Sequence, residues 1–274
     1  MVELCISIDV EEDIPGVLPP GEHGVEEGLP ALLRLLGEEH IRADFFFLSS
    51  IVRKHPDAVA AAVRKGHHVG NHGWDHRFLC TKSTGRQRDE IRRSTDLLSS
   101  VCPSPPSMFR APNFSADATT LGLLDHAGYT LDSSVLPGRY VRRFGVLTVY
   151  DHRQAPSQPF RPAGVHPGGS LVEIPVTENP LQPGTPLGQG ALNLFGPKTL
   201  IDLLLRTRPS VAVFLIHPWE LVDLDSRYRG LSPEYRRICS SDMGPLRTFL
   251  TEARRYFRFS TLPEVAARAE WGTR

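Results

Sequence analysis

The stretch Leu4-Cys5-Ile6-Ser7-Ile8-Asp9-Val10-Glu11 is an apolar run that ends in two carboxylates. Its short apolar beginning is typical of a buried β-strand. Later runs of the same kind end in polar side chains of the types that metal-dependent hydrolases use, namely His72, His76, Arg110, Asp132 and His217. A barrel enzyme collects its site from side chains at the ends of several strands. The pattern therefore predicts that these residues meet at one rim of an α/β barrel, as in a metal-dependent hydrolase.

The composition is that of a globular protein, and we expect residues 1–274 to form a single domain. The chain has 274 residues, of which 40% are hydrophobic and 23% charged. Basic and acidic residues are equal at 31 each, so no overall field attracts nucleic acid, and we expect no nucleic-acid partner. No apolar run has the length of a transmembrane segment, and the N-terminal residues lack the pattern of a secretory signal. Four scattered cysteines without a CxxC pair suit reduced thiols, so a cytoplasmic location is predicted.

Strand-like and helical patterns alternate along the chain, which favours parallel strands joined by helices. Short apolar strand candidates lie at 43–48, 67–70, 107–110, 129–131, 211–216 and 258–259. Helical spacing is found at 25–39, 57–65, 86–100, 119–127, 198–206, 242–256 and 263–269. The predicted class is α/β.

The alternation breaks between residues 137 and 197, where proline and glycine are dense. Only 146–150 and 171–176 have strand character there. We interpret residues 137–197 as an elaborated insertion that shapes the substrate pocket.

His72 and His76 are four residues apart, so one turn of chain can direct both imidazoles at one point. The same spacing also occurs in exposed loops without a metal. A catalytic metal site needs a third ligand, and alternation along an extended chain puts Asp9 and Glu11 on one side, about 7 Å apart. One carboxylate can bind metal while the other accepts a proton. The neighbouring Glu12 and Asp13 leave open which acid is the ligand, and a solvated acidic loop is the alternative interpretation.

Three further residues suit supporting roles. Arg110 precedes Ala111 and Pro112, leaves the sheet in an extended conformation, and can orient a catalytic Asp. His217 follows the most apolar strand and is placed for acid catalysis, with Asp132 as a partner that fixes its tautomer. The alternatives are an isolated surface arginine and a core histidine bonded to backbone.

The order of these motifs resembles that of the polysaccharide deacetylase family, the NodB-homology carbohydrate esterases, over nearly the whole chain. The matching segments are Asp9-Val10-Glu11-Glu12, His72-Gly73-Trp74-Asp75-His76, Arg110-Ala111-Pro112-Asn113-Phe114, Asp132-Ser133-Ser134 and Leu215-Ile216-His217-Pro218-Trp219-Glu220. The motif sequences are most similar to those of the subgroup linked to exopolysaccharide systems. They also resemble those of deformylases of lipid-linked aminoarabinose. One departure is that Val10 stands where the common pattern has a metal-binding aspartate.

The resemblance implies a distorted (β/α) barrel of about seven strands. It also implies a bound divalent metal and removal of an N-acyl group, acetyl or formyl, from an amino sugar or glycoconjugate intermediate. We expect Glu11, His72 and His76 to bind the metal. Zn²⁺ is the expected ion, and Co²⁺, Ni²⁺ and Fe²⁺ suit the same ligands. Asp9 is the expected base, Arg110 its partner, and His217 the acid, oriented by Asp132. Substrate contacts are expected from Pro112, Asn113, Phe114 and Trp219.

The substrate is expected to be a small or carrier-linked N-acylated sugar. Two alternatives stay open from the sequence. One is hydrolysis of a non-sugar amide such as a cyclic ureide. The other is a catalytically degenerate protein that binds glycans or lipid carriers.

Overall fold

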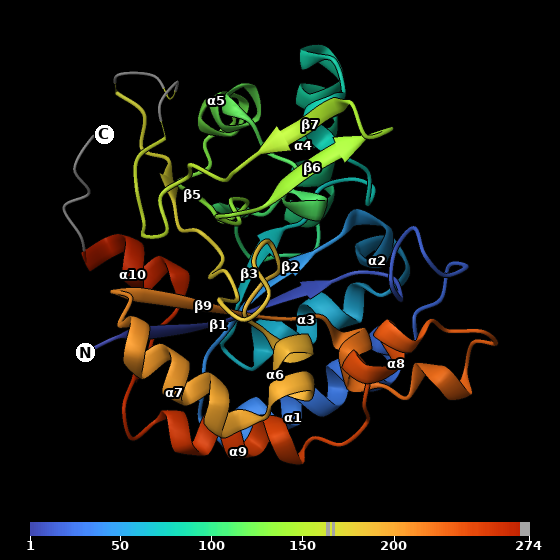
Figure 1. The fold of residues 1–274 in the computed structure, drawn as a ribbon. Coiled ribbons are helices and arrows are strands. Elements are labelled where there is room, and N and C mark those ends of the chain that lie inside the picture. Colours follow the sequence, from blue (N-terminus) through green and yellow to red (C-terminus); the bar gives the residue numbers. More distant parts are fainter. Residues whose placement is uncertain (163–164, 166–167, 269–274) are drawn as a thin grey trace.

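Strand β1 (Glu3–Val10) is the central strand of the computed structural model, which describes residues 1–162, 165 and 168–268 (Figure 1). It pairs in parallel with β9 (Val211–Ile216) on one side. On the other side it pairs with β10 (Arg258–Phe259) at its start and β2 (Asp44–Phe47) at its end. All of its residues from Leu4 to Val10 are buried, as expected for a strand covered on both faces.

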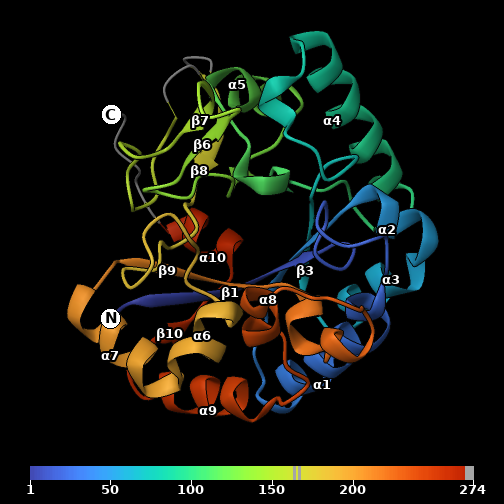
Figure 2. The same ribbon diagram turned by 45° about the vertical axis from the view of Figure 1, so that its right-hand side comes forward.

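The sheet continues from β2 through β3 (His68–Asn71), β4 (Met108–Phe109), β5 (Leu131–Asp132) and β8 (Val172–Glu173). Within the described residues, the order β9-β1-β2-β3-β4-β5-β8 gives seven parallel strands, and β10 is a short addition beside β1. The strands curl into an incomplete barrel with helices outside it (Figure 2). The predicted α/β class and the barrel of about seven strands are confirmed.

The helices cover the outer face of the sheet because their apolar stripes pack on one side of each strand. Leu4, Ile6, Ile8 and Val10 of β1 join a core cluster with these helices, whereas Cys5 belongs to a second cluster on the opposite face. The main helices are α1 (Leu29–Glu38), α2 (Ser49–Lys54), α3 (Pro56–Arg64), α4 (Thr84–Ser99), α5 (Ala118–His126), α6 (Gln189–Phe195), α7 (Pro197–Thr207), α8 (Pro233–Ile238), α9 (Gly244–Ala253) and α10 (Leu262–Arg268). Shorter turns are η1 (Gly24–Gly28), η2 (Leu79–Thr81), η3 (Pro112–Phe114), η4 (Pro218–Leu221) and η5 (Leu224–Ser226). None of the helices in the described part of the chain combines the length and apolar character needed to cross a bilayer.

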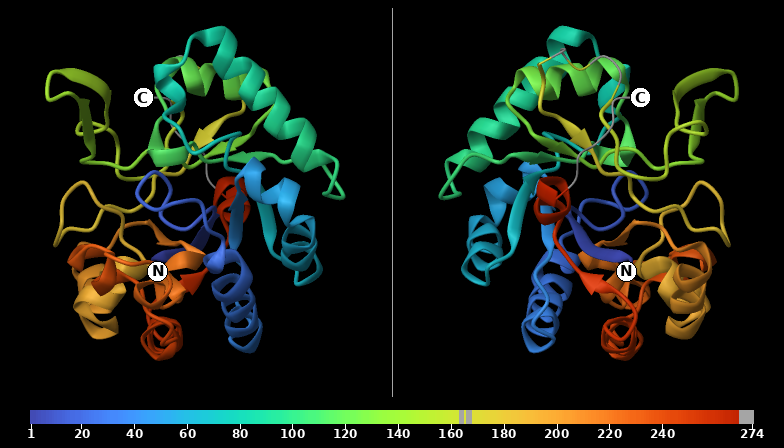
Figure 3. Two further views of the ribbon diagram at one scale, coloured as in Figure 1. Left: turned by 90° about the vertical axis from the view of Figure 1, so that its right-hand side faces the viewer. Right: turned by 90° about the vertical axis from the view of Figure 1, so that its left-hand side faces the viewer.

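Residues 137–197 do not lie wholly outside the barrel. Their β8 pairs with β5 and is a strand of the sheet, and α6 packs beside α7. The rest includes an antiparallel hairpin of β6 (Tyr140–Arg143) and β7 (Leu147–Asp151), which stands clear of the sheet (Figure 3). Residues 163–164 and 166–167 of this region, and residue 269 of the predicted helix 263–269, lie outside the described residues.

Candidate active site

The motif residues lie at one edge of the sheet because each is at or just after the carboxyl end of a parallel strand. Asp9 is the penultimate residue of β1, and His72, Arg110 and His217 directly follow β3, β4 and β9. Asp132 ends β5. This is the edge at which barrel and open α/β folds place their functional groups.

Glu11, His72 and His76 form a cluster in which one ligand atom from each lies within 4.8 Å of the others. Glu11 Oε2 is 3.3 Å from His72 Nε2 and 2.7 Å from His76 Nε2. Nδ1 of His72 lies 2.9 Å from the carbonyl oxygen of Arg110, a contact that leaves Nε2 facing Glu11. The predicted three residues are therefore brought together.

Two atoms of this cluster are buried without a hydrogen-bond partner in the described part of the chain, namely Oε2 of Glu11 and Nε2 of His72. Such orphaned atoms are costly unless something binds them. Their chemistry, one carboxylate and two imidazoles around an open side, fits a divalent metal ion. Burial raises the pKa of Glu11, but the adjacent imidazoles of His76 and His72 outweigh it and hold that pKa well below its usual value.

Arg110 is fully buried and binds Asp9, as expected. Its Nη1 donates to Asp9 Oδ1 at 2.8 Å and to Ser7 Oγ at 2.9 Å. Its Nε and Nη2 donate to the carbonyl oxygen and hydroxyl of Ser133, both at 2.8 Å. The guanidinium is thus fixed by three residues, and the other oxygen of Asp9, Oδ2, lies 3.9 Å from Nε2 of His72.

His217 lies beside Glu11, with Nε2 3.7 Å from Glu11 Oε1. Its Nδ1 is 3.2 Å from Oε2 of Glu220, which also accepts the backbone N–H of His217 at 2.7 Å. Burial lowers the pKa of His217, whereas the carboxylates of Glu220 and Glu11 raise it, and the result is a pKa of about 9. The imidazole is therefore protonated at neutral pH.

The prediction that Asp132 orients His217 is wrong, because Glu220 occupies the Nδ1 side of that imidazole. Asp132 instead accepts hydrogen bonds from the hydroxyl of Ser134 at 2.7 Å and from its backbone N–H at 3.2 Å. Ser134 in turn accepts the backbone N–H of Ala111 at 2.8 Å. Asp132 therefore supports the chain next to Arg110. The role of Glu220 was missed, although its position three residues after His217 at the start of a helical turn carried the signal.

A cavity of about 160 Å³ lies over the cluster. It is lined by Asp9, Glu11, Ile14, Pro15, His72, His76, Asn113, Phe114, Arg139, His217, Trp219 and Tyr235. Trp219 stacks on His217 with 4.8 Å between ring centroids, and its Nε1 donates to Glu11 Oε1 at 3.1 Å. Asn113 and Phe114 both have positive φ, at 56° and 58°, a strained conformation that places them at the cavity wall. Pro112 is not among the lining residues; it is buried against the turn at Gly73.

A second cavity of about 460 Å³ adjoins the first and shares His217 and Trp219 with it. Its walls are largely apolar, with Pro186, Ala191, Leu194, Leu215 and Ile238 among them. The buried side chain of Asn179 also lines it, and its Nδ2 has no hydrogen-bond partner in the described residues. Part of region 137–197 therefore borders this second cavity.

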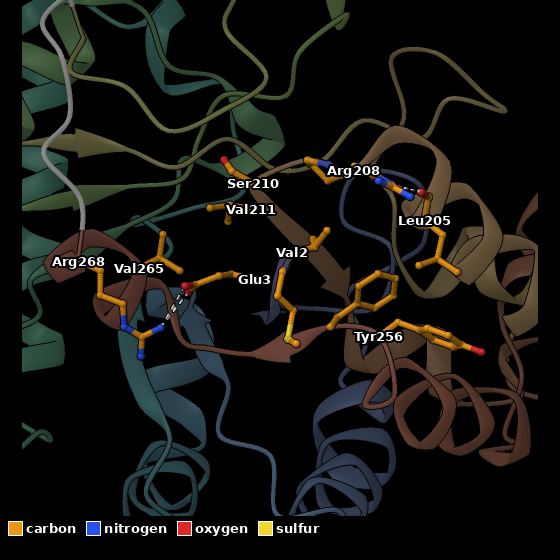
Figure 4. Close-up of a pocket in the computed structure, with 12 residues that line it drawn as sticks. Val2, Glu3, Leu205, Arg208, Ser210, Val211, Tyr256, Val265 and Arg268 are labelled. Carbon is orange, nitrogen blue, oxygen red and sulfur yellow. Dashed lines mark hydrogen bonds and ion pairs between the residues drawn. The ribbon is translucent and has the colours of Figure 1, made fainter.

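A larger cavity of about 690 Å³ lies at the opposite end of the barrel, around the starts of β1 and β9 (Figure 4). Glu3 and Arg268 form an ion pair at its wall, and Tyr256 is at its rim. None of the motif residues lines it. Its size alone does not make it a site, because the converging titratable groups are at the other edge.

The comparisons with known proteins agree with this geometry. A family model described as polysaccharide deacetylase matches residues 19–131. The solved structure of a putative polysaccharide deacetylase from Mycobacterium smegmatis aligns with 100% of this chain and 92% of its own, with a TM-score of 0.72 and 20% identity. The chain is similar to the polysaccharide deacetylase family over residues 19–131. The family match includes His72, His76 and Arg110, while the fold brings Asp9, Glu11 and His217 to them from outside the matched segment.

Peptidoglycan deacetylase from Helicobacter pylori is 26% identical over 125 residues, which are 46% of this chain and 43% of that protein. The chain thus spans less than half the length of this curated relative. The solved structure named Puue allantoinase aligns with 97% of this chain and 89% of its own, with a TM-score of 0.67 and 15% identity. At that identity the likeness shows the fold alone.

Proposed function

We propose that this chain is a member of the polysaccharide deacetylase family and a metal-dependent hydrolase that removes an acetyl or formyl group from the nitrogen of an amino sugar or glycoconjugate intermediate. One observation carries the proposal. The orphaned Oε2 of Glu11 and Nε2 of His72 lie 3.3 Å apart beneath a cavity that Asp9 and His217 also line. Metal ligands, a base and an acid are the parts that amide hydrolysis requires.

Glu11, His72 and His76 would hold the ion, with Zn²⁺ as the first choice for this ligand set. When bound, the ion polarises the amide carbonyl and makes water a better nucleophile at neutral pH. Glu11 suits the role of ligand better than Asp9, because Asp9 already binds Arg110 and lies farther from the imidazoles. Val10 cannot take part because its side chain is buried in the helix-side core.

Asp9 would accept the proton of the attacking water. Arg110 fixes its Oδ1 and leaves Oδ2 directed at the cluster. The guanidinium also compensates the charge of a carboxylate that is only 2% exposed.

His217 would protonate the departing amine, without which collapse of the tetrahedral intermediate expels water instead. Its proton is retained at neutral pH by Glu220 and Glu11, and Trp219 and Glu220 hold the ring in place. Asp9 and His217 therefore line the same cavity and would act there as base and acid.

The cavity volumes support a substrate larger than the reacting amide alone. About 160 Å³ accommodates the acylamino group, and the adjoining 460 Å³ is available to the rest of the molecule. In that cavity the unpaired Nδ2 of Asn179 offers one hydrogen bond to a hydroxyl or carbonyl oxygen. A small or carrier-linked N-acylated sugar meets these requirements.

The test pairs metal analysis of the purified protein with a screen for free amine. The substrates are N-acetyl and N-formyl amino sugars, with allantoin as the ureide arm. We expect one bound divalent ion per chain, release of amine from a sugar, and a loss of about 100- to 10,000-fold in kcat for His217→Ala. Faster turnover of allantoin would favour the ureide alternative. An absence of both metal and hydrolysis would favour a protein that only binds glycans.

A further inference from the structure

The hairpin formed by β6 and β7 carries an exposed apolar tip. Phe144, Val146 and Leu147 are 79%, 78% and 60% exposed, although each has a side chain that folding normally buries. Phe144 also has a positive φ of 52°, which is unfavourable for a bulky side chain and is not offset by packing. The hairpin is a separate two-stranded sheet that projects from the barrel (Figure 3).

Two arginines flank this tip. Arg142 and Arg143 end β6, both are exposed, and neither forms an ion pair with a carboxylate in the described residues. Arg142 contacts the hydroxyl of Tyr140, and the guanidinium of Arg143 lies over the ring of Phe144 at 5.1 Å. The tip therefore combines apolar side chains with unneutralised positive charge.

We propose that the β6–β7 hairpin docks on an anionic membrane surface, with Phe144, Val146 and Leu147 in the interfacial layer and Arg142 and Arg143 among the headgroups. A narrow, convex tip has too little surface for a stable protein interface, which buries about 800 Å² per partner. A bilayer demands no complementary shape. It accepts apolar side chains at the interface and attracts nearby arginines through anionic lipids.

The hairpin is connected to the site through its base. Tyr150 of β7 donates from its hydroxyl to the carbonyl oxygen of Asn113 at 2.5 Å, and it accepts from Nε of Arg139 at 2.9 Å. Asn113 and Arg139 both line the cavity over the metal cluster. Docking would therefore hold this cavity close to the membrane, where a carrier-linked sugar has its headgroup. The idea that docking brings the cavity to a carrier-linked sugar rests on the proposed function. The docking itself does not.

The test is co-sedimentation of the full chain with vesicles of phosphatidylcholine alone and of phosphatidylcholine with phosphatidylglycerol at 3:1. We expect partition into the anionic vesicles, weakened by added salt. Phe144→Ser combined with Leu147→Ser should lower that partition at least about tenfold. Arg142→Gln combined with Arg143→Gln should remove the preference for anionic over neutral vesicles. The matched control is Tyr256→Ser, an exposed aromatic residue at the opposite end of the barrel, which should change nothing.

Binding that is absent, equal for both compositions, or retained by the apolar-tip variant would overturn the proposal. So would a change of oligomeric state in that variant, since the tip would then join copies of the chain. An assay of the same variants with a water-soluble N-acylated sugar distinguishes a failure of membrane docking from a failure of the proposed function. The variants should keep that activity, and its absence in the unaltered protein would contradict the proposed chemistry while leaving the vesicle result intact.

Discussion

Oε2 of Glu11 lies 2.7 Å from Nε2 of His76, and the carboxylate is buried beside two imidazoles without an aligned hydrogen bond to this atom. Without a cation, the two histidines and the acid leave buried polar atoms without hydrogen bonds. A bound cation would give all three side chains a common partner. The arrangement fits the proposed metal site, which β1 and the turn after β3 would build in advance.

Glu11→Gln should weaken metal binding by at least about 100-fold, because the amide lacks the charge that compensates the ion. The measurement is metal content after dialysis against a graded chelator. Glu12→Gln is the matched control, since Glu12 is the adjacent acid and is not part of the cluster. Equal metal retention in both variants would contradict the assignment of Glu11.

Glu220→Gln should lower the pKa of His217, because it removes the carboxylate that stabilises the imidazolium. In the proposed mechanism the acid form of His217 is active, so activity should be lost on the alkaline side as His217 gives up its proton. The alkaline limb of kcat should then move to lower pH in the variant. Asp132→Asn is the comparison, and a shift of that limb in this variant but not in Glu220→Gln would restore the partner expected from the sequence.

The sequence predicted which residues end the strands but not how the strands are ordered in space. Asp9, Glu11, His72, Arg110 and His217 were predicted correctly as one group because parallel strands deliver their ends to a common edge. Asp132 was given the wrong partner because β1, β2, β3 and β4 lie between β9 and β5, an order that no local pattern reveals. The short helices α2 and α8 were missed because six residues are too few to establish a helical period.

Arg110→Met should destabilise the protein by about 3–5 kcal/mol, since it leaves the charge of Asp9 buried without its partner. Asp9→Asn introduced into the same variant should recover part of that loss, because the buried side chain at position 9 then carries no uncompensated charge. Urea unfolding of the two single variants, the double variant and the unaltered protein gives the coupling energy. Additive effects would show that Arg110 acts through packing on Phe46, over whose ring its guanidinium lies at 4.3 Å, rather than through Asp9.

Asp44 at the start of β2 provides a pH test of the fold that is separate from the site. It is fully buried, its Oδ2 accepts the backbone N–H of Leu262 at 2.8 Å, and burial raises its pKa to about 7. A carboxyl with a higher pKa in the folded state than in the unfolded state binds its proton more tightly when folded. Its contribution to stability is therefore complete below about pH 4 and is lost as the pH rises to 7.

Asp44→Asn removes this titration. Its free energy of unfolding, compared with that of the unaltered protein, should improve by about 4 kcal/mol between pH 4 and pH 8. Urea unfolding at both pH values measures the difference, with Asp89→Asn on the exposed surface of α4 as the control. The same pH dependence in all three proteins would show that Asp44 is ionised in the folded state, and that its charge is compensated by Arg110 and Arg42 despite its burial.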